Sequence, residues 1–132
     1  MTSEEKYEYW LDIAEYDLET ANIMFVGGRW LYVVFMCQQA IEKLVKGLYI
    51  LYVDDDVPRL HNINDILSRF SDKLPSISEE KYNFFDRLTR YYLNNRYPEY
   101  IQKLSMQTKQ PEAKEVLEIA KEEFNWLLTL HP

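Results

Sequence analysis

The sequence contains few residues that interrupt regular secondary structure. Its 132 residues include three glycines and five prolines, so long elements with little flexible linker are expected. Apolar residues recur at spacings of three and four through most of the chain, which is typical of amphipathic helices, and no alternation with a period of two indicates a strand. Because this length suits one compact domain, we predict a single all-α domain over residues 1–132, an up-and-down bundle of four to five helices.

Capping and breaking residues divide the chain into five predicted helices. They are expected to begin near Thr2 or Ser3, Trp30, Asn62, Ser78 and Pro111. Three N-terminal caps are predicted from the sequence: Thr2, Asn62 and Ser78. Thr2 is expected to form a capping box with Glu5. Gly27 and Gly28 are expected to end the first helix in a left-handed cap. The second helix is expected to end near Val53, and residues 94–109 to form an extended loop.

The second predicted helix is apolar around much of its circumference, so we expect it at the centre of the bundle or at a subunit interface. Four large apolar residues on its outer side are candidates for such an interface: Tyr32, Phe35, Tyr49 and Ile50. Glu42 and Lys46 form an i,i+4 pair in its polar middle. Gln38 lies beside the apolar stripe, where its amide needs partners. A structural polar network is favoured there over a ligand contact.

The chain is acidic, with a formal net charge of -7 and a pI near 4.8. General binding of nucleic acid is therefore disfavoured, although a local basic cluster could still hold phosphate. Two distant histidines and the single Cys37 offer no metal-ligand spacing, and neither a metal nor a cofactor is expected. No apolar run reaches the roughly 20 residues of a membrane span, and the N-terminus lacks the pattern of a signal peptide. These features predict a cytoplasmic protein.

The segment RYYLNNRYPEY, residues 90–100, is the main candidate binding site. Continuing the fourth helix places Arg87, Arg90 and Asn94 on one outward stripe. The guanidinium groups of the two arginines could bind phosphate, and Tyr91 or Tyr97 could stack on a base. The alternative is a solvated helix face whose arginines pair with acidic side chains, and the residues alone favour it.

Three further basic residues lie outside this segment. His61, between a loop and a helix, could cap the helix, orient the loop or act as an acid or base, and a structural use is favoured. His131 is expected to be mobile near the C-terminus. Lys43, like His61 and Arg87, is a secondary candidate for ligand binding.

Four segments together resemble the HEPN domain family. They are ANIMF (21–25), QQAIEKLVKGLYI (38–50), LHNINDIL (60–67) and RYP (96–98). The resemblance covers nearly the whole chain and implies a bundle of four or five helices that pairs as a homodimer, often beside a minimal nucleotidyltransferase. Many members are toxins that cut RNA without metal, using an Arg-x4-6-His motif at the end of the helix equivalent to the fourth here.

The motif of the toxins is altered in this chain. Arg90 is followed by five residues and then by Arg96, where the toxins place histidine. Arginine stays protonated and cannot serve as a base. The resemblance therefore implies the non-toxin branch of this toxin–antitoxin-like family, a non-catalytic module that binds a nucleotide, RNA or a nucleotidyltransferase. Arg90 and Arg96 would hold phosphate in a cleft, Tyr97 would stack, and Asn94 would fix the loop. The alternative is a metal-independent endoribonuclease with Arg90 and with His61 as substitute acid or base.

Overall fold

The computed structural model describes residues 1–94, 99, 103 and 107–132. This part of the chain is helical and has no strand, so the predicted all-α class is confirmed. Its elements are α1 (Ser3–Val26), α2 (Trp30–Tyr52), α3 (Ile63–Leu67), the 3-10 helix η1 (Ser71–Lys73), α4 (Glu79–Asn94) and α6 (Gln110–Leu128). None of these helices is both long and apolar enough to cross a membrane.

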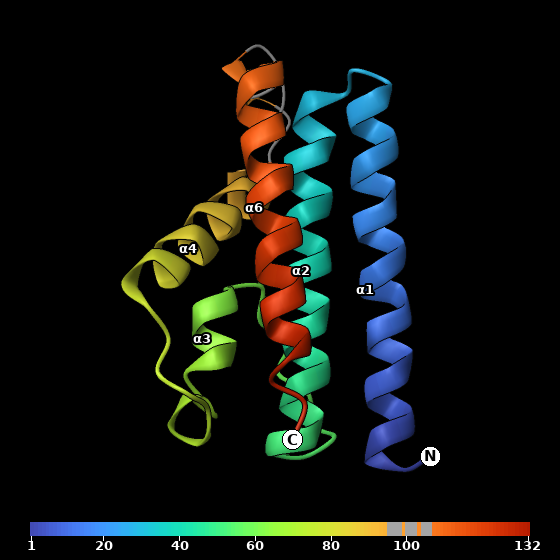
Figure 1. Cartoon of the computed structure of the whole chain (residues 1–132), viewed down its shortest axis with the longest axis vertical. Helices are drawn as coiled ribbons and strands as arrows, with labels where there is room; N and C mark the ends of the chain where they lie inside the picture. Colours follow the sequence, from blue (N-terminus) through green and yellow to red (C-terminus); the bar gives the residue numbers. More distant parts are fainter. Residues whose placement is uncertain (95–98, 100–102, 104–106) are drawn as a thin grey trace.

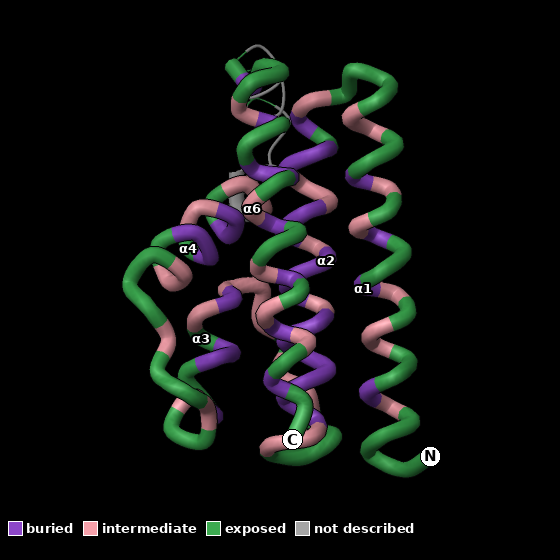
Figure 2. Tube along the Cα trace, viewed as in Figure 1, coloured by how far each residue is buried: buried purple, intermediate pink, exposed green. Residues whose placement is uncertain are grey.

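The helices are arranged around α2, as its all-round apolar character predicts. Helix α1 runs antiparallel to α2 and packs along its length, while α6 lies against another side of α2 (Figure 1). Helix α4 crosses the bundle at an angle, and the short α3 lies below α4 in the view and contacts both α4 and α2 (Figure 1). The burial pattern agrees with this arrangement, because α2 is buried along most of its length (Figure 2).

Capping bonds confirm the three N-terminal caps predicted at Thr2, Asn62 and Ser78. Thr2 and Glu5 form a capping box, in which each backbone N–H donates to the other side chain at 3.1 Å. The side chains of Asn62 and Ser78 each accept from the N–H three residues later, at 3.2 and 3.3 Å. Gly28 supplies the left-handed residue after α1, with φ 73°.

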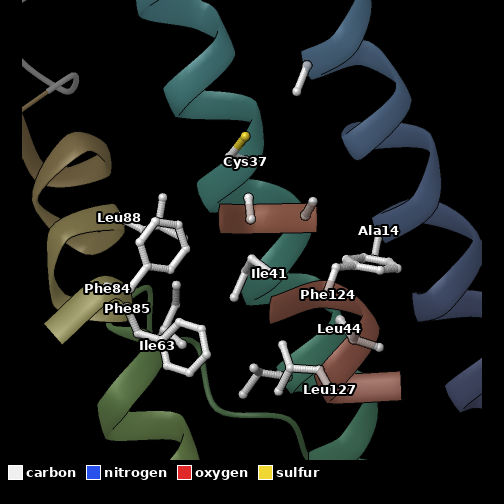
Figure 3. Close-up of a cluster of buried hydrophobic side chains, with 14 of the residues drawn as sticks. Ala14, Cys37, Ile41, Leu44, Ile63, Phe84, Phe85, Leu88, Phe124 and Leu127 are labelled. Atoms are coloured by element: carbon white, nitrogen blue, oxygen red, sulfur yellow. The ribbon is translucent and has the colours of Figure 1, made fainter. Parts of the chain in front are cut away.

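One hydrophobic core joins all the long helices. The inner stripes predicted for α1, α2, α4 and α6 meet in it, and α3 packs against it. Figure 3 shows residues from these elements in contact: Ala14 of α1, Ile41 and Leu44 of α2, Ile63 of α3, Phe84, Phe85 and Leu88 of α4, and Phe124 and Leu127 of α6. Burial of these side chains supplies the main favourable term for folding.

Two residues expected on the outer side of α2 are buried. Tyr49 and Ile50 are only 6% and 4% exposed, so the prediction that they cover a subunit interface is wrong. The chain that follows α2 covers them. Tyr49 packs edge-on against Phe70, with ring centroids 6.2 Å apart, and Ile50 lines the same hollow as Val57. Tyr32 remains 47% exposed.

The extended loop predicted for residues 94–109 is wrong at four described positions. Asn94 is the last residue of α4, and Glu99, Lys103 and Gln107 have helical backbone. Polar residues of these types are good helix formers, so a low apolar content does not exclude a helix. Positions 95–98, 100–102 and 104–106 of this prediction lie outside the described residues.

The two chain ends lie at the same end of the bundle (Figure 1). His131, which was expected to be mobile, contacts α1 instead. Its Nε2 lies 2.8 Å from a carboxylate oxygen of Glu4, and its ring packs edge-on against Tyr7 with centroids 5.0 Å apart. This contact fixes the C-terminus against the first turns of the chain.

Candidate functional site

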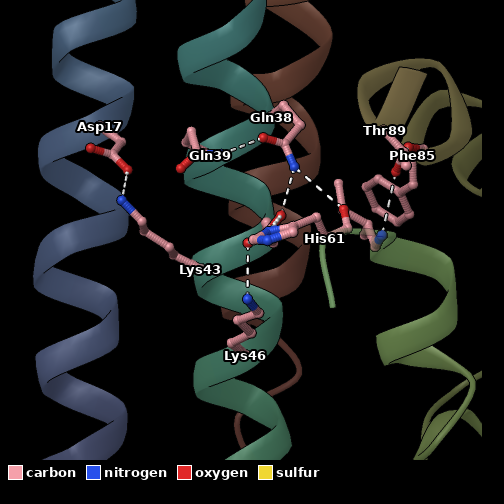
Figure 4. A network of polar contacts seen from close by, with 10 residues as sticks. Asp17, Gln38, Gln39, Lys43, Lys46, His61, Phe85 and Thr89 are labelled. Carbon is pink, nitrogen blue, oxygen red and sulfur yellow. Dashed lines mark hydrogen bonds and ion pairs between the residues drawn. The ribbon is translucent and has the colours of Figure 1, made fainter. Parts of the chain in front are cut away.

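Polar residues of α2 gather around one buried carboxylate. Glu42 is 3% exposed. Lys46 Nζ donates to one of its oxygens at 3.0 Å, and Gln38 Nε2 donates to the other at 2.8 Å (Figure 4). Gln39 in turn donates to Gln38 Oε1 at 2.6 Å. Burial of a charge is costly unless it is paired and hydrogen-bonded, and here it is both. The expected partners of Gln38 are confirmed.

The same carboxylate orients His61, which follows the loop after α2. His61 Nδ1 lies 3.2 Å from each oxygen of Glu42, and its side chain is 42% exposed. Because a carboxylate accepts hydrogen bonds, Nδ1 carries the hydrogen in this geometry and the lone pair of neutral imidazole falls on Nε2. Nδ1 is thus held against the buried Glu42, and Nε2 is on the opposite side of the half-exposed ring.

Helix α4 completes the surroundings of His61. The imidazole stacks on the ring of Tyr92, with centroids 4.3 Å apart and planes inclined by 28°. Tyr92 also stacks on Phe35 of α2 at 6.1 Å. One turn before Tyr92, Thr89 Oγ1 accepts from the N–H of Ile63 at 3.3 Å. These contacts dock the start of α3 onto one face of α4 and leave a half-exposed pair of stacked rings near its C-terminal end.

Arg90 lies on a different side of α4. It is exposed and forms no ion pair with any residue that the structure describes. A step of two positions along an α-helix is a rotation of about 200°. Arg90, two positions before Tyr92, therefore faces away from Tyr92 and from the imidazole stacked on it. Within one chain, the guanidinium of Arg90 and the ring of His61 therefore do not converge on one point.

Arg87 is occupied by contacts that hold α4 on α6. Its Nη1 lies 2.5 Å from Glu115, its Nη2 lies 3.9 Å from Glu112, and its Nε donates to the hydroxyl of Tyr91 at 3.3 Å. The Tyr91 hydroxyl also donates to Glu112. Burial, together with this bond to Glu112, raises the pKa of Tyr91 to about 12. Arg87 and Tyr91 thus serve the helix packing, which is the structural alternative weighed for this stripe.

Lys43 is also used within the fold. Its Nζ lies 2.5 Å from the carboxylate of the buried Asp17, which joins α1 to α2 (Figure 4). The side chain of Asn94, together with Arg96 and Tyr97, lies outside the described part, so the binding roles predicted for these residues stay predictions. The described residues include no cluster of three His, Cys, Asp or Glu side chains placed to hold a metal ion.

The partners of His61 are not evident from the sequence pattern. That pattern places Glu42 in an i,i+4 pair with Lys46 and gives no link from Glu42 to His61. One signal could have identified Glu42. A helix that is apolar on most sides is covered by neighbouring elements, so little of its polar middle reaches solvent. An acid there has to be paired inside the fold.

The arrangement has three chemical capabilities. An exposed guanidinium without an internal partner among the described residues can bind phosphate oxygens, and a half-exposed aromatic pair can stack with a nucleobase. An imidazole held by a carboxylate can also transfer a proton, provided that a substrate reaches Nε2. The guanidinium lies on one side of α4, and the stacked rings, which include the imidazole, lie on the other.

Comparison with known proteins identifies relatives of the whole domain. The model of the HEPN domain matches residues 7–130. TT1696 from Thermus thermophilus has a similar structure, with a TM-score of 0.81 and 24% identity over 94% of this chain and 97% of that one. ST0689, described as an archaeal HEPN homologue, has a TM-score of 0.72 and 26% identity over 100% of both chains. No curated protein matches the chain.

Proposed function

Since the chain belongs to the HEPN domain family, we propose that it is a non-catalytic HEPN module that binds a nucleotide or a segment of RNA at the end of α4. The observation that carries this proposal is that Arg90 faces away from Tyr92 of α4 and from the His61 ring stacked on it. A single chain offers an anion-binding guanidinium on one side of α4 and the His61–Tyr92 stack on the other, so it does not bring an acid or base to the bound phosphate.

Phosphate binding is assigned to Arg90. A guanidinium can donate two parallel hydrogen bonds to a phosphate group, and it keeps its charge at any physiological pH. Among the arginines of α4 in the described part, Arg87 is paired with acids of α6, whereas Arg90 is exposed. Arg96 would add a second cation. Binding through so few charges in a chain of net charge -7 is expected to be weak and sensitive to salt.

The proposed lack of cleavage rests on the geometry that the reaction requires. RNA cleavage through the 2′-hydroxyl needs a proton acceptor at that hydroxyl and positive charge at the same phosphate. His61 is turned toward Glu42 and Tyr92, while Arg90 points elsewhere. Because a missing acid or base typically costs about 10²- to 10⁴-fold in rate, binding is the activity that this arrangement supports best.

Titration of a fluorescently labelled single-stranded RNA, followed by anisotropy at several salt concentrations, tests the assignment. Arg90→Ala is expected to weaken binding and to lower the slope of log affinity against log salt by about 0.7, the value for one phosphate contact on a single strand. Arg69→Ala removes another exposed arginine, after α3, and should leave the slope unchanged. If the two variants behave alike, phosphate binding by Arg90 is wrong.

One observation favours a second candidate function, a metal-independent endoribonuclease. Glu42 fixes the tautomer of His61, which is the arrangement that an acid or base needs. Such an enzyme would require a homodimer that brings Arg90 of one chain to His61 of the other. The test is the appearance of products with 2′,3′-cyclic phosphate ends. They must disappear in His61→Ala and persist in His131→Ala to establish this function.

A protein partner is proposed on the family resemblance alone. Many HEPN modules occur beside a minimal nucleotidyltransferase, and we extend that pairing to this chain. Mixing the purified chain with a nucleotidyltransferase encoded next to it, followed by light scattering, tests the pairing. A single complex of defined mass supports the proposal, and two separately eluting proteins contradict it.

A further inference from the structure

The outer face of α1 carries a row of large exposed apolar residues. Tyr9, Tyr16 and Ile23 follow one another at intervals of seven, which is nearly two turns, and they are 59%, 69% and 66% exposed. The opposite side of the helix carries the buried residues Tyr7, Ala14 and Ala21, and the outer side stays exposed along the helix (Figure 2). We call Tyr9, Tyr16 and Ile23 the apolar row. A helix face that exposes several large apolar residues is a candidate interaction surface.

A hollow extends the apolar row at its C-terminal end. It has a volume of about 430 Å³ and is lined by Thr20, Met24, Arg29, Tyr32 and Met36. Its walls are mainly apolar, and the flexible thioethers of methionine adapt to side chains of different shape. Its volume falls within the range of about 300–1,000 Å³ found for ligand sites. The hollow can therefore accept apolar anchors from a partner that lies along α1.

The apolar row is bordered by acidic residues. Glu8, Asp12, Glu15 and Glu19 are spaced by four, three and four, and all are exposed. Lys6 is the only basic residue of α1, and it pairs with Asp55 of the loop after α2. Lys121 of α6 lines one hollow with Glu15 and Glu19, and Arg29 lines the hollow at the end of the apolar row. The outer face thus combines an apolar row with a line of negative charge that these cations compensate only in part.

This charge decides which kind of molecule fits the face. If two copies of the chain paired through this face, the acidic line of one would lie against the acidic line of the other, because α1 has no exposed basic row. Like charges brought together destabilise an interface. RNA phosphates would be repelled for the same reason. We infer that the outer face of α1 is a docking surface for a positively charged amphipathic helix of another protein, with apolar anchors on the apolar row and lysines or arginines against the acidic line.

The inferred surface is separate from the proposed nucleotide site. It lies on α1, whereas Arg90 and the His61–Tyr92 stack lie on α4 and the chain before α3. A helix laid into a groove recognises its partner through side chains spaced by three, four and seven residues, which matches the spacing of the apolar row. The inference therefore holds or fails independently of RNA binding.

Selection of random displayed peptides on the intact chain tests the inference. Peptides that bind are expected to carry apolar residues every three or four positions together with lysine or arginine. A selected peptide, synthesised and titrated by calorimetry, should bind Ile23→Ser and Glu19→Lys about tenfold more weakly than the parent chain. Glu118→Lys makes the same charge change at an exposed position of α6 and should leave the affinity unaltered.

Three results would overturn the inference. The first is selection of acidic or uncharged peptides. The second is equal affinity of the selected peptide for the parent chain and for Ile23→Ser. The third is a dimer of the parent chain in sedimentation velocity that dissociates on Ile23→Ser, since a second copy would then occupy the face.

Discussion

At the scale of single residues, Glu42 controls the polar centre of the fold. Lys46, Gln38 and His61 all place a nitrogen within hydrogen-bond distance of its two oxygens. In a dry interior each bond is stronger than in water, and a partner left unpaired is more costly. The same carboxylate that stabilises the bundle therefore also determines how His61 presents its ring to the surface.

Replacing Glu42 with alanine is expected to destabilise the protein by about 3 kcal/mol or more. The change leaves the ammonium of Lys46 buried without its partner, and breaking a buried ion pair from one side typically costs about 3–5 kcal/mol. Urea unfolding followed by circular dichroism measures the loss. Glu15→Ala removes an exposed acid of α1 and should change the free energy of unfolding by no more than about 0.5 kcal/mol. Equal losses in the two variants would contradict the buried pairing.

Cys37 is expected to be inert in the folded protein. Burial raises the pKa of its thiol to about 12, and the thiolate is the reactive form. Mass spectrometry after treatment with iodoacetamide at pH 8 should find no adduct on the native chain and one adduct in denaturant. Rapid labelling of the native chain would show that Cys37 is accessible.

At the scale of elements, the sequence predicts the helices better than the contacts between them. Caps such as Asn62 and Ser78 act within one turn, so local rules identify them. The burial of Tyr49 depends on Phe70, and the orientation of His61 depends on Glu42, nineteen positions earlier. Neither contact leaves a local pattern, because loop closure and not helix periodicity brings those residues together.

A close approach of α1 and α2 yields a test of their packing. A Cβ added at Gly47 would lie 3.1 Å from Cβ of Trp10 and 3.2 Å from Cδ2 of Tyr7. Gly47→Leu is therefore expected to lower the free energy of unfolding by about 1–3 kcal/mol through overpacking. Thermal and urea unfolding measure the change.

Gly27 provides the matched position for this test. A Cβ there would meet its nearest neighbour at 3.5 Å, an ordinary contact, and its backbone is right-handed with φ −82°. Gly27→Leu should be tolerated without a comparable loss. If Gly47→Leu is no more destabilising than Gly27→Leu, the tight contact between the two helices is absent.

At the scale of the whole molecule, the C-terminus is fastened to the start of the chain. His131 contacts Glu4 and Tyr7, and Tyr52 at the end of α2 donates to the carbonyl of Leu130. The two ends thus meet at one end of the bundle. Contacts across so many intervening residues cost more chain entropy than local ones, so this closure depends on the rest of the fold being formed.

The contact between His131 and Glu4 is expected to weaken as the pH rises. The hydrogen bond to Glu4 raises the pKa of His131 above its ordinary value of 6.5, against a smaller opposing effect of burial. A raised folded-state pKa contributes stability that is fully present below about pH 6.5 and is lost as the pH rises through the folded value. The difference in free energy of unfolding between the parent chain and His131→Gln should therefore shrink between about pH 6 and pH 8.5. A difference that is constant or grows would contradict the ion pair.

The most direct test of a module that binds without cutting measures both activities in one sample. A labelled single-stranded RNA is incubated with excess protein, and its anisotropy and its length on a denaturing gel are recorded over the same period. The account predicts saturable binding that depends on Arg90, with the RNA remaining full-length. Shortened RNA that appears with the parent chain and is lost in His61→Ala would contradict it.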